Sequence, residues 1–182
     1  KNATDVQADA YAEEHLFTPM QISNYEWIKS SEFWTKLESG EIPDVPKPDP
    51  PIEYPGYFAT YPHTGGGLKM LPRDMAKLGQ LYLNKGTWNG KQILPAAWVE
   101  QSVQPHYGNN EYGYGWRLAK YSVQGKETNC YYATGFGLQS IYVLPEYQLV
   151  VVFTQQNYRN MQEGSRQTQD VLQNYVLKAV TG

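Results

Sequence analysis

The spacing of hydrophobic residues predicts helices in the first part of the chain. Apolar positions at 4–17 share one helical face, and Pro19 ends that stretch. The clearest pattern covers residues 72–85, where apolar or small residues recur at i, i+3, i+4 and i+7 after a proline suited to a first turn. A shorter helix is predicted from Pro95. A stretch rich in aromatic residues after Pro19 has no clear period.

After about residue 110 the pattern changes to short runs rich in β-branched and aromatic residues. Such runs, separated by Gly or Pro turns, are typical of neighbouring antiparallel strands. A last amphipathic helix is predicted over 165–180, with Val171, Leu172, Tyr175 and Ala179 on one face. The predicted strands are 112–121, 128–135, 138–144 and 148–154.

Helices followed by an antiparallel meander and a closing helix indicate the α+β class. We expect a helical and loop region over 1–110 and a sheet with its helix over 111–182, together forming one compact unit. Residues 43–62 are dense in proline, which excludes a helix or a sheet interior. Because tyrosines and Phe58 alternate with these prolines, we expect an ordered, extended loop rather than a linker.

Composition excludes several classes of function. The 182 residues carry a net charge of −3 and contain no basic block, which argues against nucleic acid and against an anionic membrane surface. The longest aliphatic and Phe run, 149–153, is too short to span a bilayer. One cysteine excludes an internal disulfide framework, and Cys130 is expected to be a buried, inert thiol. The three histidines match no metal-ligand spacing, so neither a metal nor another cofactor is predicted.

The segment 134–139, Thr-Gly-Phe-Gly-Leu-Gln, is the main candidate for chemistry. Glycines at the end of a strand let a substrate approach the main chain, and free N–H groups there can stabilise an oxyanion. A plain hairpin turn explains the same residues equally well. The glycines at 65–67 lack the Lys-Ser/Thr of a phosphate-binding loop, and His63-Thr64-Gly65 lies outside any predicted strand, so both are interpreted as structural.

Five stretches in the right order resemble the serine β-lactamase-like hydrolase family, which includes class C β-lactamases, penicillin-binding DD-peptidases and related esterases. The resemblance extends over most of the chain outside the proline-rich segment. The stretches are Leu-Phe-Thr-Pro-Met at 16–20, Gly-Gly-Gly-Leu at 65–68 with Pro-Arg-Asp-Met-Ala-Lys-Leu-Gly at 72–79, the segment from Gly86 to Trp98, Tyr-Gly-Tyr-Gly-Trp at 112–116, and the segment from Tyr132 to Pro145.

The resemblance implies a partial β-lactamase/transpeptidase-like fold and places the family's third catalytic element, Lys/His-Thr-Gly, at Ala133-Thr134-Gly135. By this analogy Thr134 and Gly135 line the acyl pocket, and the Phe136 N–H is one oxyanion donor. Ala133 stands where the family has a basic residue, so the charge that binds a substrate carboxylate is absent. Other esters or amides then remain open as substrates.

The family's first two elements, Ser-x-x-Lys and Tyr-x-Asn, are not found where the family has them. No serine here is followed three places later by lysine, and the three Tyr-x-Asn matches lie in the wrong places. Because the chain begins at Lys1, we expect the C-terminal part of a hydrolase that is inactive alone and that either self-associates through an open sheet edge or has limited stability. The resemblance also implies a small-molecule or peptide-like substrate and a periplasmic or extracellular location. The alternative is a non-catalytic module that binds carbohydrate or peptidoglycan through its sixteen tyrosines and five tryptophans.

Overall fold

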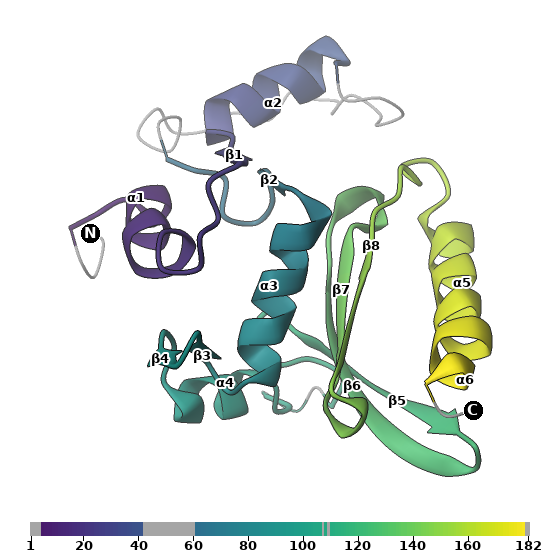
Figure 1. Cartoon of the computed structure of the whole chain (residues 1–182). Helices are drawn as coiled ribbons and strands as arrows, with labels where there is room; N and C mark the ends of the chain where they lie inside the picture. Colours follow the sequence, from purple (N-terminus) through teal and green to yellow (C-terminus); the bar gives the residue numbers. More distant parts are fainter. Residues whose placement is uncertain (1–4, 42–60, 107, 109, 181–182) are drawn as a thin grey trace. The chain divides into compact units, whose positions relative to one another are not determined.

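The computed structural model describes residues 5–41, 61–106, 108 and 110–180 (Figure 1). The chain divides into two units, Lys1–Leu71 and Pro72–Gly182, which are described separately below. This division falls inside the region expected to extend over 1–110, and the boundary expected at residue 110 stays a prediction. Most of the proline-rich segment 43–62, and with it the expected extended loop, lies outside the described residues.

The first unit begins with a helix that is shorter than predicted. Helix α1 covers Ala8–Ala12 and continues as the π-helical turn η1, Glu13–Phe17. The expected start at residue 4 is wrong, because residues 5–7 are not helical: Asp5 has a left-handed φ of 54°, and Gln7 is the N-cap. The buried Phe17 ring packs against Tyr25, with the ring centroids 4.6 Å apart.

The aromatic stretch without clear period forms a strand and a helix. Strand β1, Tyr25–Trp27, pairs antiparallel with β2, Leu68–Met70. Helix α2, Ser30–Ser39, ends at Gly40, which has the left-handed φ of 80° that favours glycine at a helix C-terminus. His63 stacks on Phe33 of α2 at 4.4 Å, so the residues His63-Thr64-Gly65 lie in a loop packed on this helix.

The second unit contains the predicted meander. Strands β5, Arg117–Val123; β6, Lys126–Thr134; β7, Ser140–Leu144; and β8, Leu149–Phe153, form one antiparallel sheet in that order. The first strand begins five residues later than predicted. Gly115 has φ +79°, which interrupts extended backbone, and Tyr112 forms only an isolated bridge with Arg117.

Helix α3, Pro72–Leu83, packs on one face of this sheet (Figure 1). The approach is close at Gly79, where an added Cβ would lie 2.5 Å from Val150 Cγ1. Because the side chains of a strand alternate between faces, every second residue of β7 and β8 points toward this helix. The buried residues of this face are Trp116, Tyr131, Ile141 and Val143.

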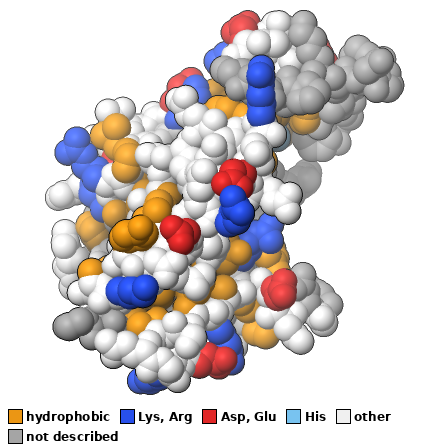
Figure 2. All heavy atoms as spheres, turned by 90° about the vertical axis from the view of Figure 1, so that its right-hand side faces the viewer, with side chains coloured by type: hydrophobic (Ala, Val, Ile, Leu, Met, Phe, Trp, Pro, Cys, Tyr) orange, Lys and Arg blue, Asp and Glu red, His pale blue; other side chains and the backbone are white. Residues whose placement is uncertain are grey.

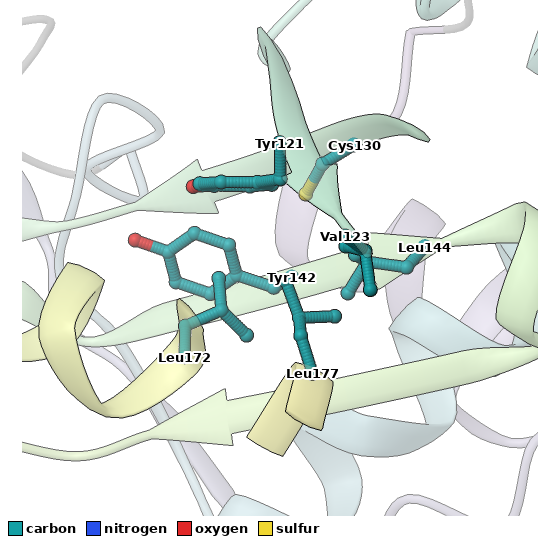
Figure 3. Packing of buried hydrophobic residues seen from close by; sticks show 7 residues of the cluster. All are labelled: Tyr121, Val123, Cys130, Tyr142, Leu144, Leu172 and Leu177. Atoms are coloured by element: carbon teal, nitrogen blue, oxygen red, sulfur yellow. The ribbon is translucent and has the colours of Figure 1, made fainter. Parts of the chain in front are cut away.

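The C-terminal helix covers the opposite face. It comprises α5, Met161–Val171, the π-helical turn η5, Leu172–Val176, and α6, Leu177–Ala179. It begins four residues earlier than predicted, because the Asn160 side chain accepts a hydrogen bond from the Glu163 N–H at 3.1 Å and caps it. Figure 3 shows the core beneath it, formed by Tyr121, Val123, Cys130, Tyr142, Leu144, Leu172 and Leu177.

Shorter elements connect these layers. Strands β3, Thr87–Trp88, and β4, Lys91–Gln92, form a hairpin, followed by α4, Ala96–Ser102. The 3-10 helices η3, Phe136–Leu138, and η4, Pro145–Tyr147, join β6 to β7 and β7 to β8. The predicted α+β order of helices, antiparallel meander and C-terminal helix is confirmed.

The surface over the C-terminal helix carries some apolar side chains. Figure 2 shows this face, where scattered orange hydrophobic groups lie between charged side chains and white atoms of the backbone and other side chains. Large apolar residues that remain exposed are Met161, Val171 and Tyr175 of this helix and Val180 at its C-cap. In the described part of the chain, every helix is too short or too polar to cross a membrane.

Candidate active site

The candidate segment forms a tight connection between two hydrogen-bonded strands. Thr134, the last residue of β6, pairs with Ser140, the first residue of β7. The Gly135 N–H donates to the Gln139 carbonyl at 2.8 Å, and the Leu138 N–H donates to the Gly135 carbonyl at 3.0 Å. These two bonds fix the backbone on both sides of Phe136.

The Thr134 side chain lies on the sheet face that packs against the C-terminal helix, where Ser140 contacts it. Its Oγ1 lies 3.2 Å from the hydroxyl of Ser140, which is only 2 % exposed and also lies 3.1 Å from the Leu138 carbonyl. A buried hydroxyl with two partners has little freedom to rotate, so Ser140 fixes the position of the threonine side chain.

Ala133 lies on the opposite face of the sheet. Its methyl group packs with the cluster beneath α3, next to residues such as Tyr131 and Ile141. Since neighbouring residues of a strand point to opposite faces, a basic side chain at 133 would also start on the α3 face. The structure therefore brings Thr134, Gly135 and Phe136 into one loop but places the Ala133 side chain on the other face.

Phe136 presents both an amide and a ring. Within the described part of the chain, its N–H has no backbone acceptor outside the short helix that it begins. Its side chain is 48 % exposed, and its ring centroid lies 5.0 Å from that of Tyr158. A backbone N–H with this freedom can donate to a carbonyl oxygen that becomes negatively charged during acyl transfer.

Tyr158 covers the loop at Gly137. This glycine has φ +72°, and an added Cβ would lie 2.4 Å from Cε1 of the tyrosine ring. The Asn157 N–H also donates to the Gly137 carbonyl at 3.3 Å. Both the backbone angle and the ring contact require glycine here, so the loop and the segment after β8 fit each other closely.

A cavity of about 430 Å³ opens beside the loop. It is lined by Gln139, Thr154, Gln155, Gln156 and Tyr158. The Gln139 carboxamide donates to the Gln155 carbonyl and accepts from the Gln155 N–H at 3.3 Å, so it continues the pairing of β7 and β8 by one side-chain rung. Gln155 and Tyr158 were not candidates on sequence grounds. Tyr158 begins one of the three Tyr-x-Asn matches that lie in the wrong places for the family's second element.

Burial makes one thiol and three phenols of this unit poor nucleophiles. Burial raises the pKa of Cys130 to about 12, despite an opposing hydrogen bond with the Val143 backbone, so the thiol is protonated at neutral pH. Burial also raises the pKa of Tyr121, Tyr131 and Tyr142. Among the described residues, no group of three or more His, Cys, Asp or Glu side chains could hold a metal ion.

A second cavity, of about 480 Å³, lies in the first unit next to η1. Burial raises the pKa of Tyr25 in its wall, with the Glu13 carboxylate adding to the shift. The cavity has no residue of the candidate segment in its lining. Its lining residues are Glu13, Thr18, Gln21, Ile22, Ser23 and Tyr25.

Comparison with known families identifies the class of protein. A family model described as Beta-lactamase matches residues 1–175. The chain belongs to this family, and the predicted relationship to β-lactamase-like hydrolases is confirmed.

Among solved structures, one that resembles this chain is a protein of Bacillus anthracis assigned as a 6-aminohexanoate-dimer hydrolase. The two are 26 % identical with a TM-score of 0.49, and the match covers 68 % of this chain and 31 % of the other. The chain thus spans about a third of the length of that relative. The comparison with curated proteins gives no match. The family assignment rests on the family model.

Proposed function

We propose that this chain is the C-terminal part of a serine hydrolase that cleaves an amide or ester through an acyl-enzyme. The observation that carries the proposal is the unused Phe136 N–H, held at the end of β6 by the Gly135–Gln139 hydrogen bond, in a chain of the Beta-lactamase family. Thr134 and Gly135 directly precede this amide at the end of β6, and the proposal assigns them to the wall of the acyl pocket. The acylated serine and its lysine come from residues outside this sequence.

The coding sequence upstream of Lys1 tests this proposal first. An in-frame Ser-x-x-Lys followed by Tyr-x-Asn is expected if the chain contributes one wall of an acyl-transfer site. A separate domain or a linker in that place would overturn the proposal. It would favour the alternative module that binds carbohydrate or peptidoglycan, for which Trp98 offers a 44 % exposed ring stacked on Tyr114 at 5.6 Å.

The 182-residue chain alone is expected to form no acyl adduct. Incubation with a fluorophosphonate or a p-nitrophenyl ester should leave its intact mass unchanged, whereas the longer protein should gain the mass of one acyl group or phosphonyl group. The buried, protonated Cys130 thiol should not react within the same time. An adduct on the isolated chain, mapped to a serine by peptide mass spectrometry, would contradict the missing nucleophile.

Self-association of the isolated chain is the second expectation. Strand β8 is one of the two edge strands of its sheet and consists of five uncharged residues, Leu149–Phe153, whereas the other edge strand, β5, carries Arg117 and Lys120. An edge without charge or proline pairs readily with another strand, and we propose that a second copy supplies it. Sedimentation velocity should show a mass that rises with concentration. A single monomeric species over the whole accessible range would exclude this pairing.

The family likeness also suggests a location outside the cytoplasm, in the periplasm or the extracellular space. A fusion of the longer protein to a reporter that is active only after export tests this part of the proposal. An inactive reporter would contradict the proposed location and would leave the acyl-transfer proposal unaffected.

A further inference from the structure

Three aromatic rings of the second unit stack beside helix α4. The Tyr114 ring lies nearly parallel to that of His106, with the centroids 3.9 Å apart and the planes inclined by 6°. It is also stacked with the Trp98 ring, at 5.6 Å and 20°. His106 and Tyr114 are half-buried, whereas Trp98 is 44 % exposed and keeps much of its indole surface open. These three residues form the ring stack.

Hydrogen bonds hold the segments that carry the ring stack. The Tyr114 N–H donates at 2.8 Å to the carbonyl of Ser102, the last residue of α4. An added Cβ on Gly113 would lie 2.2 Å from the same carbonyl oxygen, so the two segments are in close contact. The His106 Nε2 lies 2.8 Å from the Gln101 carbonyl oxygen. The rings are thus ordered before a ligand arrives, which lowers the entropy cost of binding to them.

Gln101 places a polar group beside the exposed indole. It follows Trp98 by three residues on α4, and residues with this spacing are neighbours on a helix surface. Its side chain is exposed, and among the described residues no hydrogen bond of its carboxamide is found. The surface therefore combines an open aromatic ring with a carboxamide that has both donors and an acceptor to offer.

Formal charges balance around this surface. Histidine aside, the acidic and basic residues on the segments that carry the ring stack are Glu100, Glu111 and Arg117. The Glu100 carboxylate lies 3.3 Å from the Lys85 ammonium, and the Arg117 guanidinium lies 5.7 Å from the centroid of the Tyr112 ring. Two acidic groups and two basic groups leave no net charge here, so a neutral ligand suits the surface better than an ion.

A saccharide matches both the ring and the carboxamide. The axial C–H bonds of a pyranose form an apolar face with slightly positive hydrogens, and an aromatic ring has a negative face and a large apolar area. Two neighbouring hydroxyl groups of the same pyranose can donate to and accept from one carboxamide. A polyproline peptide also docks on aromatic rings, but it has no backbone N–H and would leave the Gln101 acceptor unused.

We propose that Trp98 and Gln101 form a binding site for a neutral saccharide, with the apolar face of one pyranose ring on the indole and two of its hydroxyl groups paired with the carboxamide. The proposal goes beyond the proposed function, because the site shares no residue with the Phe136 loop or with the cavity beside that loop.

Titration of the 182-residue chain with cellotetraose, a neutral oligomer of β-linked glucose, tests the proposal. In two-dimensional NMR spectra the Trp98 indole N–H should shift saturably, and Trp98→Phe identifies this resonance among the five tryptophans. Sorbitol carries similar hydroxyl groups without a ring face and should cause no saturable shift. Because no ion pair is involved, the affinity for cellotetraose should change less than about twofold between about 0.01 M and about 1 M salt. An unchanged Trp98 indole signal, or an equal response to sorbitol, would overturn the proposal.

Variants test the two contacts separately, with binding measured by calorimetry. Trp98→Ala should weaken cellotetraose binding at least about tenfold, because the stacked ring face and its apolar area are lost. Gln101→Ala should weaken it about two- to tenfold, the effect of one lost hydrogen bond. Tyr175→Ala and Gln173→Ala, at exposed positions of the C-terminal helix, are the matched controls and should not change the affinity. If Trp98→Ala is folded and binds as tightly as Tyr175→Ala, the ring stack is not the site.

Hexaproline distinguishes a saccharide site from a peptide site. Tighter binding of hexaproline than of cellotetraose at the Trp98 indole would make this surface a peptide-docking site and would overturn the saccharide proposal. Weaker binding of hexaproline, together with saturable binding of cellotetraose, is the expected result.

The binding assay needs no nucleophile, so its outcome is separable from that of the proposed function. Saccharide binding together with an upstream Ser-x-x-Lys would define a hydrolase with a second, carbohydrate-binding site. Saccharide binding without it would retain this site and remove the hydrolase. An upstream Ser-x-x-Lys without saccharide binding would retain the hydrolase and remove this site.

Discussion

Replacing Phe136 with proline is expected to lower the acyl-transfer rate of the longer hydrolase by about 10²–10³-fold, the effect of removing one oxyanion donor. Proline at 136 removes the backbone N–H of this residue and keeps its carbonyl group. The local geometry tolerates it, because Phe136 is the first residue of η3 and Gly135 before it is extended, with φ −113° and ψ −178°. Rates with a p-nitrophenyl ester, measured under saturating substrate, give the comparison.

Phe136→Ala is the matched control. It removes the ring that packs against Tyr158 but keeps the amide, so kcat should stay within a few-fold of the unmodified protein while the substrate affinity falls. A fold check by circular dichroism applies to both variants. If Phe136→Pro is folded and acts as fast as Phe136→Ala, the Phe136 amide is not an oxyanion donor.

Replacing Leu172 with alanine is expected to lower the free energy of unfolding by about 2–5 kcal/mol. Leu172 is fully buried and lies in the π-helical turn η5, where it packs on the core that includes Tyr142 and Leu144 (Figure 3). The truncation leaves a cavity between the C-terminal helix and the sheet, which the rigid strands β6 and β7 cannot fill by moving. Chemical denaturation followed by tryptophan fluorescence measures the loss.

Val171→Ala provides the control at the preceding position. Val171 is 41 % exposed, and such a surface change should alter the free energy of unfolding by no more than about 0.5 kcal/mol. Equal effects at 171 and 172 would mean that the C-terminal helix is not docked on the sheet through Leu172.

The sheet was predictable because its residues follow simple rules. Alternating and β-branched runs separated by glycine or proline turns located all four strands of the meander, and the proline at 72 located α3. Strand and helix ends were less accurate. The start of β5 depends on the positive φ of Gly115, and the start of α5 depends on the Asn160 cap.

Helix α2 escaped prediction for a different reason. Its residues have no strong helical period, and its two aromatic side chains, Phe33 and Trp34, are ordered by a ring from the loop some thirty residues later, that of His63. Contacts of this kind over a long separation leave no local pattern in the sequence.

The candidate site was predictable only in part. The glycines around Phe136 indicated a strand end open to a ligand, and the family resemblance gave these residues their roles. The residues that hold the loop, Ser140, Gln155 and Tyr158, gave no signal, because each acts through a partner on another element. The Ala133 side chain faces α3 because of the register in which β6 pairs with β7. The sequence alone does not specify this register.

The Phe136 amide resonance tests the central claim most directly. The longer protein, labelled with ¹⁵N-phenylalanine and reacted with a phosphonate that mimics the tetrahedral intermediate, should show a marked downfield shift of the Phe136 amide proton as it donates to the phosphonyl oxygen. The Phe136→Ala variant lacks this resonance, so the missing signal identifies the Phe136 amide among those of the phenylalanines. A Phe136 amide that stays at its unreacted position while the nucleophile is fully phosphonylated would contradict the claim that this chain supplies the oxyanion wall of a β-lactamase-like serine hydrolase.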